Sequence, residues 1–422
     1  MDVLTMKQRA TQITDIATSL ADELNCTGYP EPSFQHGLPI PLQGDAPVSR
    51  ASRLHRKLVQ IVDELNALLT DPTLLLTPEL RIPTLSVHPL IRLRIAANFP
   101  ENGTFVSELA AALQLDEGLV RRLLAHSATY HVFYEAEPDF FVHTAASRLL
   151  ATDEGLRDWI LIGMEEMLPG TFKTADALLR YPGSEEPADC GWGVANDTKK
   201  PIFQALDIMP LRGERFARAM EWRVQAPGFA IRYLIDTFPW PNGDAQGQFT
   251  VVDVGGGLGH VSRALSKHAP NAQFIVQDTT SVAAQGKAAL SVIGGRIRFE
   301  GHDFFEQQPA HGADVYLLRL ILHDWSDKYA TMILKALVPA LRPGAKVVIN
   351  DRVVPGRGEV HYLHEREARD YDLYMMSLQN GRERTAEDVR ALLNKVDKRF
   401  ELTKVHQPIG SILAVVEVTW IG

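Results

Sequence analysis

The chain has 422 residues, of which 45% are hydrophobic and 23% charged, a composition typical of a folded globular protein with two or three domains. The formal net charge of −9 gives the chain no general attraction for phosphate backbones, so nucleic acid is not an expected partner. There is no run of about 18 apolar residues, so we expect no transmembrane helix.

The cysteine content bears on redox compartment and metal binding. Cys26 and Cys190 are the two cysteines, and they lie far apart without the spacing of paired metal ligands. They support neither a zinc site nor a disulfide framework. We therefore expect no metal and a reducing, cytoplasmic location.

The first segment, residues 1–84, is predicted to contain two helices separated by an irregular arm. Residues 1–25 and 49–69 carry apolar residues at near-helical spacing, whereas residues 26–49 contain five prolines. These helices are best explained by core or dimer packing.

The second segment, residues 85–150, has the pattern of a winged helix. Arg121 and Arg122 on its third helix suggest a DNA reader, but Asp116 and Glu117 lie near the start of the same helix. Packing or dimerisation explains this segment better. Its expected helices are Val87–Ala97, Ser107–Leu113 and Glu117–Ala125, and its expected strands are Val132–Glu135 and Phe140–Val142.

Residues 151–248 are predicted to be mostly helical, and residues 249–422 to alternate strands with helices. The alternation predicts a doubly wound α/β domain with a mainly parallel sheet. A terminal hairpin would place one antiparallel strand in it, as in S-adenosylmethionine (SAM) methyltransferases, by analogy of fold. The expected strands are Phe249–Val254, Gln273–Gln277, Arg296–Glu300, Val315–Leu322, Lys346–Asp351, Phe400–His406 and Ile412–Trp420.

A glycine-rich turn follows the first strand of this domain. Asp253 is followed by Val254 and then by glycines at 255, 256, 257 and 259, with a helix expected from His260. The dinucleotide fingerprint needs a glycine at its sixth position, which is His260 here, so a nicotinamide cofactor is disfavoured. We expect Asp253, Gly255 and Gly257 to bind SAM.

Acidic residues follow the next two strands. Asp278 ends the second strand, where its carboxylate could accept hydrogen bonds from ribose hydroxyls. Asp303 follows the third strand and could meet the adenine amino group, with Phe304 covering the ring. Each Asp could instead cap a strand end, and Phe304 could be a core residue. Because ligands bind at the carboxyl ends of such strands, the cofactor explanation is favoured.

His323 lies where the fourth strand ends and a helix is expected, in the run His323-Asp324-Trp325-Ser326-Asp327. A histidine with an ordinary pKa near 6.5 would be neutral at pH 7 and could remove a phenolic proton. A carboxylate on its other nitrogen would hold the tautomer and stabilise the imidazolium. A capping or packing role is the plainer alternative for a lone histidine.

Together these motifs resemble the His-dependent small-molecule O-methyltransferases of plants and fungi, the caffeate and flavonoid type. The resemblance covers roughly residues 85–422, and the long N-terminal arm is more similar to fungal secondary-metabolite members. It implies a winged-helix dimerisation domain, a SAM domain, a homodimer and no metal. The motifs that carry it are residues 251–259, Asp278, 301–305, 323–327 and Gly381-Arg382-Glu383-Arg384-Thr385.

The resemblance also implies roles for individual residues. His323 matches the general base and Glu383 the carboxylate that holds it, and Asp324 belongs to the same motif. Asp351 stands where plant members carry Glu, so its contact with His323 is open. Arg319 replaces a cofactor-contacting Lys.

The acceptor pocket is less well specified by the sequence. Met220 falls in a helix that the resemblance places along the cleft, and aromatic or Met side chains could clasp a flat ring. Core packing is an equal alternative for each. The candidates are Phe172, Met220, Trp222, Trp240, Met375 and Met376.

Three other functions are alternatives to methyl transfer. Some fungal proteins of this fold act as pericyclases or dehydratases on polyketide-derived intermediates, and the departures at Asp351 and Arg319 are where such a change could lie. A SAM-sensing winged-helix regulator would need a basic stripe on the third helix of residues 85–150. A nicotinamide enzyme would need the missing glycine. Retention of His323 and Glu383 favours O-methyl transfer to a small secondary metabolite.

Overall fold

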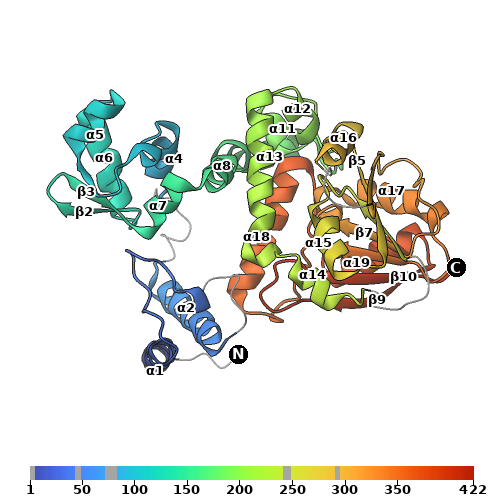
Figure 1. The fold of residues 1–422 in the computed structure, drawn as a ribbon, viewed down its shortest axis with the longest axis horizontal. Helices are drawn as coiled ribbons and strands as arrows, with labels where there is room; N and C mark the ends of the chain where they lie inside the picture. Colours follow the sequence, from blue (N-terminus) through green and yellow to red (C-terminus); the bar gives the residue numbers. More distant parts are fainter. Residues whose placement is uncertain (1–4, 43–48, 72–82, 241–248, 290–294) are drawn as a thin grey trace. The chain divides into compact units, whose positions relative to one another are not determined.

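The structure is a computed structural model that describes residues 5–42, 49–71, 83–240, 249–289 and 295–422. The chain forms two compact units (Figure 1), Met1–Glu165 with Leu211–Val224, and Glu166–Pro210 with Gln225–Gly422. The four segments predicted from the sequence are a finer division of the chain, and they stay a prediction.

The first unit is mostly helical. Ser49 caps the second helix, because its Oγ accepts a hydrogen bond from Ser52 N at 3.1 Å. Both helices predicted before residue 70 are confirmed, and part of the arm, residues 43–48, lies outside the described residues. The helices are α1 (Met6–Cys26), α2 (Arg50–Leu69), α4 (Thr84–Arg92), α5 (Val106–Leu113), α6 (Glu117–Ala128), α7 (Ala145–Thr152), α8 (Glu154–Ile162) and α13 (Pro210–Gln225), with short helices η1 (Ile40–Leu42) and η2 (Ala96–Asn98).

Residues 85–150 follow the predicted order of three helices and a hairpin. β1 (Thr104–Phe105), β2 (Phe133–Glu137) and β3 (Phe140–His143) form a small sheet in the order β1-β3-β2. The expected helix Val87–Ala97 is wrong at its bounds, because Arg94 adopts a φ of +58° and separates α4 from η2. A winged-helix role in dimerisation stays a prediction.

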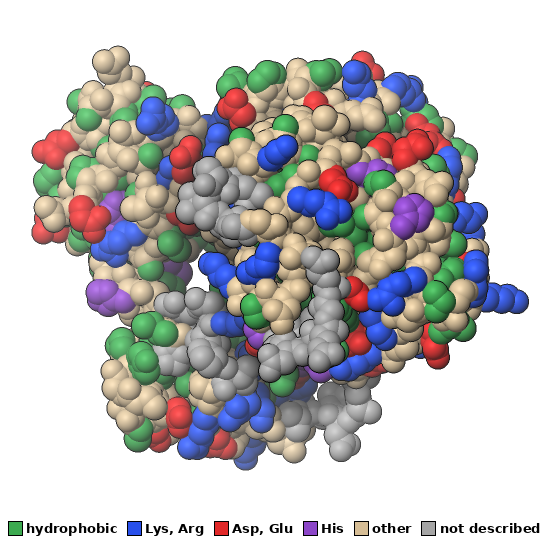
Figure 2. Space-filling model, turned by 45° about the vertical axis from the view of Figure 1, so that its right-hand side comes forward, with side chains coloured by type: hydrophobic (Ala, Val, Ile, Leu, Met, Phe, Trp, Pro, Cys, Tyr) green, Lys and Arg blue, Asp and Glu red, His purple; other side chains and the backbone are tan. Residues whose placement is uncertain are grey.

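Two charged residues of α6, Glu117 and Arg121, are paired within this unit. Arg121 donates to Glu117 at 2.7 Å and to Asp139 at 2.6 Å. Across the face shown in Figure 2, Lys and Arg side chains are interspersed with Asp and Glu. This pairing leaves Arg121 poorly suited to bind a phosphate backbone.

The second unit contains a seven-stranded sheet in the order β6-β5-β4-β7-β8-β10-β9. β10 runs antiparallel to both neighbours, and β4, β5, β6, β7 and β8 pair in parallel, so the predicted α/β fold with a terminal hairpin is confirmed. The strands are β4 (Phe249–Val254), β5 (Ala272–Asp278), β6 (Ile297–Gly301), β7 (Val315–Arg319), β8 (Lys346–Asn350), β9 (Phe400–His406) and β10 (Val415–Trp420).

In this unit two expected strand bounds differ from the structure by three residues, and the other bounds differ by at most one residue. β7 ends at Arg319 instead of Leu322, because Leu320 adopts a left-handed φ of +54° that strand pairing does not tolerate. β10 begins at Val415 instead of Ile412. The remaining elements of the unit are η3 (Gly163–Met167, a π-helix shared with the first unit), α9 (Leu168–Phe172), α10 (Thr174–Arg180), α11 (Gly191–Ala195), α12 (Ile202–Asp207), η4 (Pro227–Phe229), α14 (Arg232–Thr237), α15 (His260–His268), α16 (Thr280–Ala288), η5 (Leu322–Asp324), α17 (Asp327–Leu337), η6 (Val338–Ala340), α18 (Tyr362–Gln379) and α19 (Ala386–Val396).

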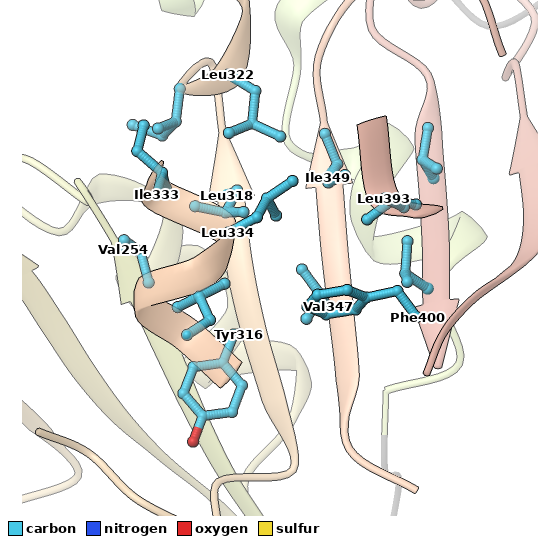
Figure 3. Packing of buried hydrophobic residues seen from close by; sticks show 14 of the residues in the cluster. Val254, Tyr316, Leu318, Leu322, Ile333, Leu334, Val347, Ile349, Leu393 and Phe400 are labelled. Carbon is cyan, nitrogen blue, oxygen red and sulfur yellow. The ribbon is translucent and has the colours of Figure 1, made fainter. Parts of the chain in front are cut away.

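Both faces of the sheet are buried, as its apolar strands require. On one face, side chains of β4, β7 and β8 point toward Ile333 and Leu334 of α17 and Leu393 of α19 (Figure 3). The alternate residues of the same strands pack against α14 and α15 on the other face. Trp240 is 4% exposed in this second core and donates to Leu234 O at 3.2 Å, so it is a core residue.

No helix of the described residues is both long and apolar enough to cross a membrane.

Candidate active site

In the turn after β4, Gly256 and Gly257 are glycines for different reasons. A Cβ on Gly256 would lie 2.6 Å from the carboxyl carbon of Asp253, so a side chain there has no room. Gly257 has a φ of +56°, and no atom of the described residues lies within 4 Å of the position that its Cβ would take. Gly256 therefore serves the packing of the turn, whereas Gly257 faces open space suited to a ligand.

Asp253 is buried and bonded to the helix that follows this turn. Its side chain is 2% exposed and accepts a hydrogen bond from Ser262 Oγ of α15 at 2.6 Å. Burial raises the pKa of Asp253 to about 6, although the bond from Ser262 opposes that rise. Asp253 thus ties the turn to α15, and a direct contact with the cofactor stays a prediction.

The other predicted cofactor residues meet at the same edge of the sheet. Asp278 accepts a hydrogen bond from Gly257 N at 2.9 Å, which fixes its carboxylate beside the turn. A Cβ on Gly255 would lie 3.7 Å from Cε1 of Phe304 and 2.5 Å from Cδ1 of Ile321. Asp303 is exposed after β6 and accepts from the backbone N–H two residues later. The residues suggested by the sequence thus follow neighbouring parallel strands at one edge of the sheet, and their contact with SAM stays a prediction.

His323 lies in η5, directly after β7, and its side chain is 16% exposed. Its Nδ1 is 3.1 Å from Oε1 of Glu383, a side chain that is 2% exposed. Within the described part of the chain, Nε2 has no hydrogen-bond partner. The pair thus leaves one imidazole nitrogen open while a carboxylate holds the other, which is the arrangement of a general base with an orienting acid.

Two further carboxylates surround this pair. Asp324 places Oδ1 3.7 Å from Nε2 of His323, and the same oxygen accepts from Nε2 of Gln379 at 2.8 Å. Asp351 bonds to backbone, accepting from Ile321 N at 3.3 Å and from the next N–H at 3.1 Å. The shorter side chain at position 351 therefore holds the η5 backbone and makes no hydrogen bond to the imidazole.

These carboxylates change the titration of His323. Burial alone would lower its pKa, but the negative charges of Asp324, Glu383 and Asp351 raise the pKa to about 10. Burial also raises the pKa of Asp324 to about 6. The expected ordinary pKa near 6.5 is wrong, because the fold brings Glu383 and Asp351 to the imidazole in addition to the neighbouring Asp324.

Arg384 and Gly381 belong to the same site, and their structural roles were not predicted. Arg384 is 4% exposed and donates to Leu322 O at 2.7 Å, to Trp325 O at 2.8 Å and to Asp327 at 2.9 Å. A Cβ on Gly381 would lie 2.6 Å from His323 O. The run Gly381–Thr385 was the available signal, and it marks a segment that packs directly on η5.

Arg319 ends β7, and its bonds go to the protein. Its guanidinium donates to Oδ1 of Asn350 and to Phe229 O. Burial lowers the pKa of Arg319 to about 10, although Asp253 opposes that shift. A contact between Arg319 and the cofactor stays a prediction.

The predicted acceptor residues are distributed over both units. Met375 and Met376 are partly buried in the last turn of α18, just before Gln379, whereas Phe172 is 78% exposed at the end of α9. Met220 and Trp222 lie on α13 of the first unit, where Trp222 donates to Asp153 at 2.9 Å. Their contact with an acceptor stays a prediction.

The described residues fit SAM on two observations. Open space above Gly257 can receive a ligand, and Asp278 offers carboxylate oxygens beside it. Among the described residues, no group of three or more His, Cys, Asp or Glu side chains is arranged to hold a metal ion.

Comparison with known proteins gives the family. Residues 242–397 match the O-methyltransferase domain family. The chain is 35% identical over 381 residues to the O-methyltransferase AMT9 of Alternaria alternata, which covers 88% of this chain and 87% of that protein.

Two solved structures share the fold. The crystal structure of OxaC in complex with SAH and oxaline has a TM-score of 0.74 at 22% identity, covering 98% of this chain and 100% of OxaC. A structure described as a pericyclic reaction enzyme has a TM-score of 0.70 at 22% identity, covering 87% of this chain and 94% of that one. With the relative above and the geometry at the sheet edge, the chain belongs to the family of SAM-dependent O-methyltransferases.

Proposed function

We propose that this protein transfers the methyl group of SAM to a hydroxyl oxygen of a small aromatic or polyketide-type secondary metabolite, with His323 as the general base. The observation that carries the proposal is the 3.1 Å contact between His323 Nδ1 and Glu383, which leaves Nε2 open. His323 follows β7, which is the sheet neighbour of β4, so the base and the glycine turn lie at the same carboxyl edge of the sheet.

The chain's own residues divide the work as follows. Gly255, Gly257, Asp278, Asp303 and Phe304 would hold SAM, which supplies an electrophilic methyl group when bound. Only the neutral form of His323, which is the minor form below its raised pKa of about 10, can take the proton of the acceptor hydroxyl at Nε2, so that the oxygen can accept the methyl group. Glu383 stabilises the imidazolium through Nδ1. The proton is then released to solvent as the pair returns to its starting state.

The acceptor is proposed to lie against Met375 and Met376, and Phe172, Met220 and Trp222 stay candidates from the sequence. Flexible thioethers and aromatic faces suit a flat, apolar ring. Met375 and Met376 lie near the C-terminal end of α18, which ends at Gln379, so in the chain they precede Glu383, the acid that holds the base.

We also propose a homodimer in a reducing cytoplasm. The family resemblance supports the dimer, and it can be measured by light scattering on the purified chain. Cys26 is exposed and Cys190 buried, and both are free thiols, which is compatible with a reducing compartment.

Pericyclic or dehydratase chemistry is the alternative function. The likeness to a pericyclic enzyme at 22% identity concerns the fold alone, so it favours neither chemistry. Arg319 was one place where an acid for such a reaction could lie, but its donors are directed to Asn350 and a backbone carbonyl. The intact His323–Glu383 pair favours methyl transfer.

The test uses methyl-labelled SAM with a panel of phenols, aromatic polyketides and hydroxypyridones. Label in a product, lost in His323→Ala while SAM still binds, is the expected result. Isomerisation or water loss without label transfer, unchanged in His323→Ala, would replace the proposal with pericyclic chemistry.

A further inference from the structure

Gln379 is a buried polar residue that the proposed mechanism does not use. It ends α18, is 3% exposed, and donates from Nε2 to Asp324 Oδ1 at 2.8 Å. Its own Oε1 is buried without a hydrogen-bond partner among the described residues. A flipped amide would direct that oxygen at a carboxylate oxygen, so the bond to Asp324 fixes the orientation of the amide.

The bond to Gln379 determines how Asp324 meets His323. Asp324 Oδ1 stops 3.7 Å from Nε2 of His323, which is beyond hydrogen-bond range. A carboxylate so near an imidazole gains by closing that distance, since an ionised pair in a buried site attracts strongly. The amide of Gln379 offers Oδ1 a competing donor.

The other charged groups around His323 are already engaged. Glu383 places Oε1 on Nδ1, and Asp351 accepts from the backbone N–H groups of η5. Arg384 directs its guanidinium to backbone carbonyls and to Asp327. Of the charged groups that face the imidazole, Asp324 is therefore the one that can compete with an acceptor hydroxyl for Nε2.

We propose that Gln379 is a positioning residue that restrains Asp324 and thereby keeps Nε2 of His323 open for the acceptor hydroxyl. The restraint matters to catalysis because a base nitrogen bonded to a carboxylate cannot accept a substrate proton. The inference rests on the proposed role of His323 as the base.

The first variant is Gln379→Met, which keeps an unbranched side chain of similar length and removes the donor. We expect Asp324 to move onto Nε2, within 3.2 Å in a crystal structure of the variant. A closer carboxylate stabilises the imidazolium, so the pKa of His323 should rise by about one unit. Histidine NMR titration measures it directly, and the His323→Asn spectrum identifies the resonance.

The same variant has a kinetic consequence. At pH 7 the kcat/KM for the acceptor should fall about tenfold, and the acidic limb of its pH profile should move to higher pH. The Kd for SAM should stay unchanged. Gln379→Leu provides a second variant if the methionine form does not fold.

Two controls separate positioning from a general packing defect. In an Asp324→Ala background, Gln379→Met should no longer shift the pKa of His323, because there is no carboxylate to restrain. Ser377→Ala removes a buried hydroxyl two residues away that bonds to Tyr374 O, and it should leave the His323 titration as in the unchanged protein.

An unchanged or lowered His323 pKa in Gln379→Met, or an equal shift in the Asp324→Ala background, would overturn the proposal. The NMR titration needs no methyl transfer, so it tests the restraint even if the enzyme proves to run a different reaction. Failure of label transfer by the unchanged protein would instead count against the proposed function alone.

Discussion

Nδ1 of His323 lies 3.1 Å from Oε1 of Glu383, across 60 positions of sequence. η5 carries the histidine and the segment after α18 carries the acid, and Arg382 N donates to His323 O at 2.9 Å to hold the two segments together. The contact gives the imidazole a defined orientation, because only one of its nitrogens remains for the acceptor.

Glu383→Gln should lower kcat by roughly 10²- to 10⁴-fold. The amide keeps the shape of the side chain but removes the charge that stabilises the imidazolium, as in catalytic triads. Single-turnover transfer of labelled methyl at saturating SAM measures the chemical step. A fall of less than tenfold would mean that Glu383 does not support the base.

The stabilising effect of His323 should depend on pH in a defined direction. Its folded pKa of about 10 lies above the ordinary 6.5, so the contribution is full below pH 6.5 and is lost as pH rises toward 10. Thermal unfolding of the unchanged protein and of His323→Asn should therefore differ most near pH 6 and least near pH 10. A difference in unfolding temperature between the two proteins that grows as pH rises would contradict a His323 pKa raised by neighbouring carboxylates.

The glycine turn allows a matched pair of substitutions. Gly256→Ala would press its Cβ against Asp253 at 2.6 Å, and we expect a loss of about 1–3 kcal/mol in unfolding free energy. Gly257→Ala meets no neighbour but must adopt a φ of +56°, which costs roughly 1–2 kcal/mol.

The two glycine variants should differ in how much SAM affinity they lose compared with how much thermal stability they lose. Because Gly257 faces open space, a methyl group there should weaken SAM binding by more than the loss of thermal stability predicts. Calorimetric titration with SAM, alongside thermal unfolding, separates the two effects. Unchanged SAM affinity in Gly257→Ala would place the cofactor elsewhere.

Arg384→Ala should destabilise the second unit by about 3–5 kcal/mol, because it leaves carbonyls of Leu322 and Trp325 without their buried donor. Arg384→Lys should recover only part of the lost stability, since a single ammonium cannot reproduce the forked contacts of the guanidinium. Thermal unfolding measures both. Arg390 of α19 is the control: its exposed pair with Glu387 should contribute less than about 1 kcal/mol.

Local pattern was sufficient to predict much of the fold. Strand alternation and turn residues predicted the parallel sheet and its terminal hairpin, because periodicity reports which side chains are buried. Bounds were wrong where one residue took a left-handed conformation, at Arg94 and Leu320, since nothing in residue type announces it.

The sequence by itself determined the glycine turn, the acids at the strand ends and, by resemblance, the pairing of His323 with Glu383. Only the tertiary structure decided that Asp351 bonds to backbone 29 positions away and that Gln379 reaches Asp324 across 55. Hydrogen bonds and pKa values depend on distance and burial, which arise when separate segments pack. The raised pKa of His323 is therefore a property of the folded site.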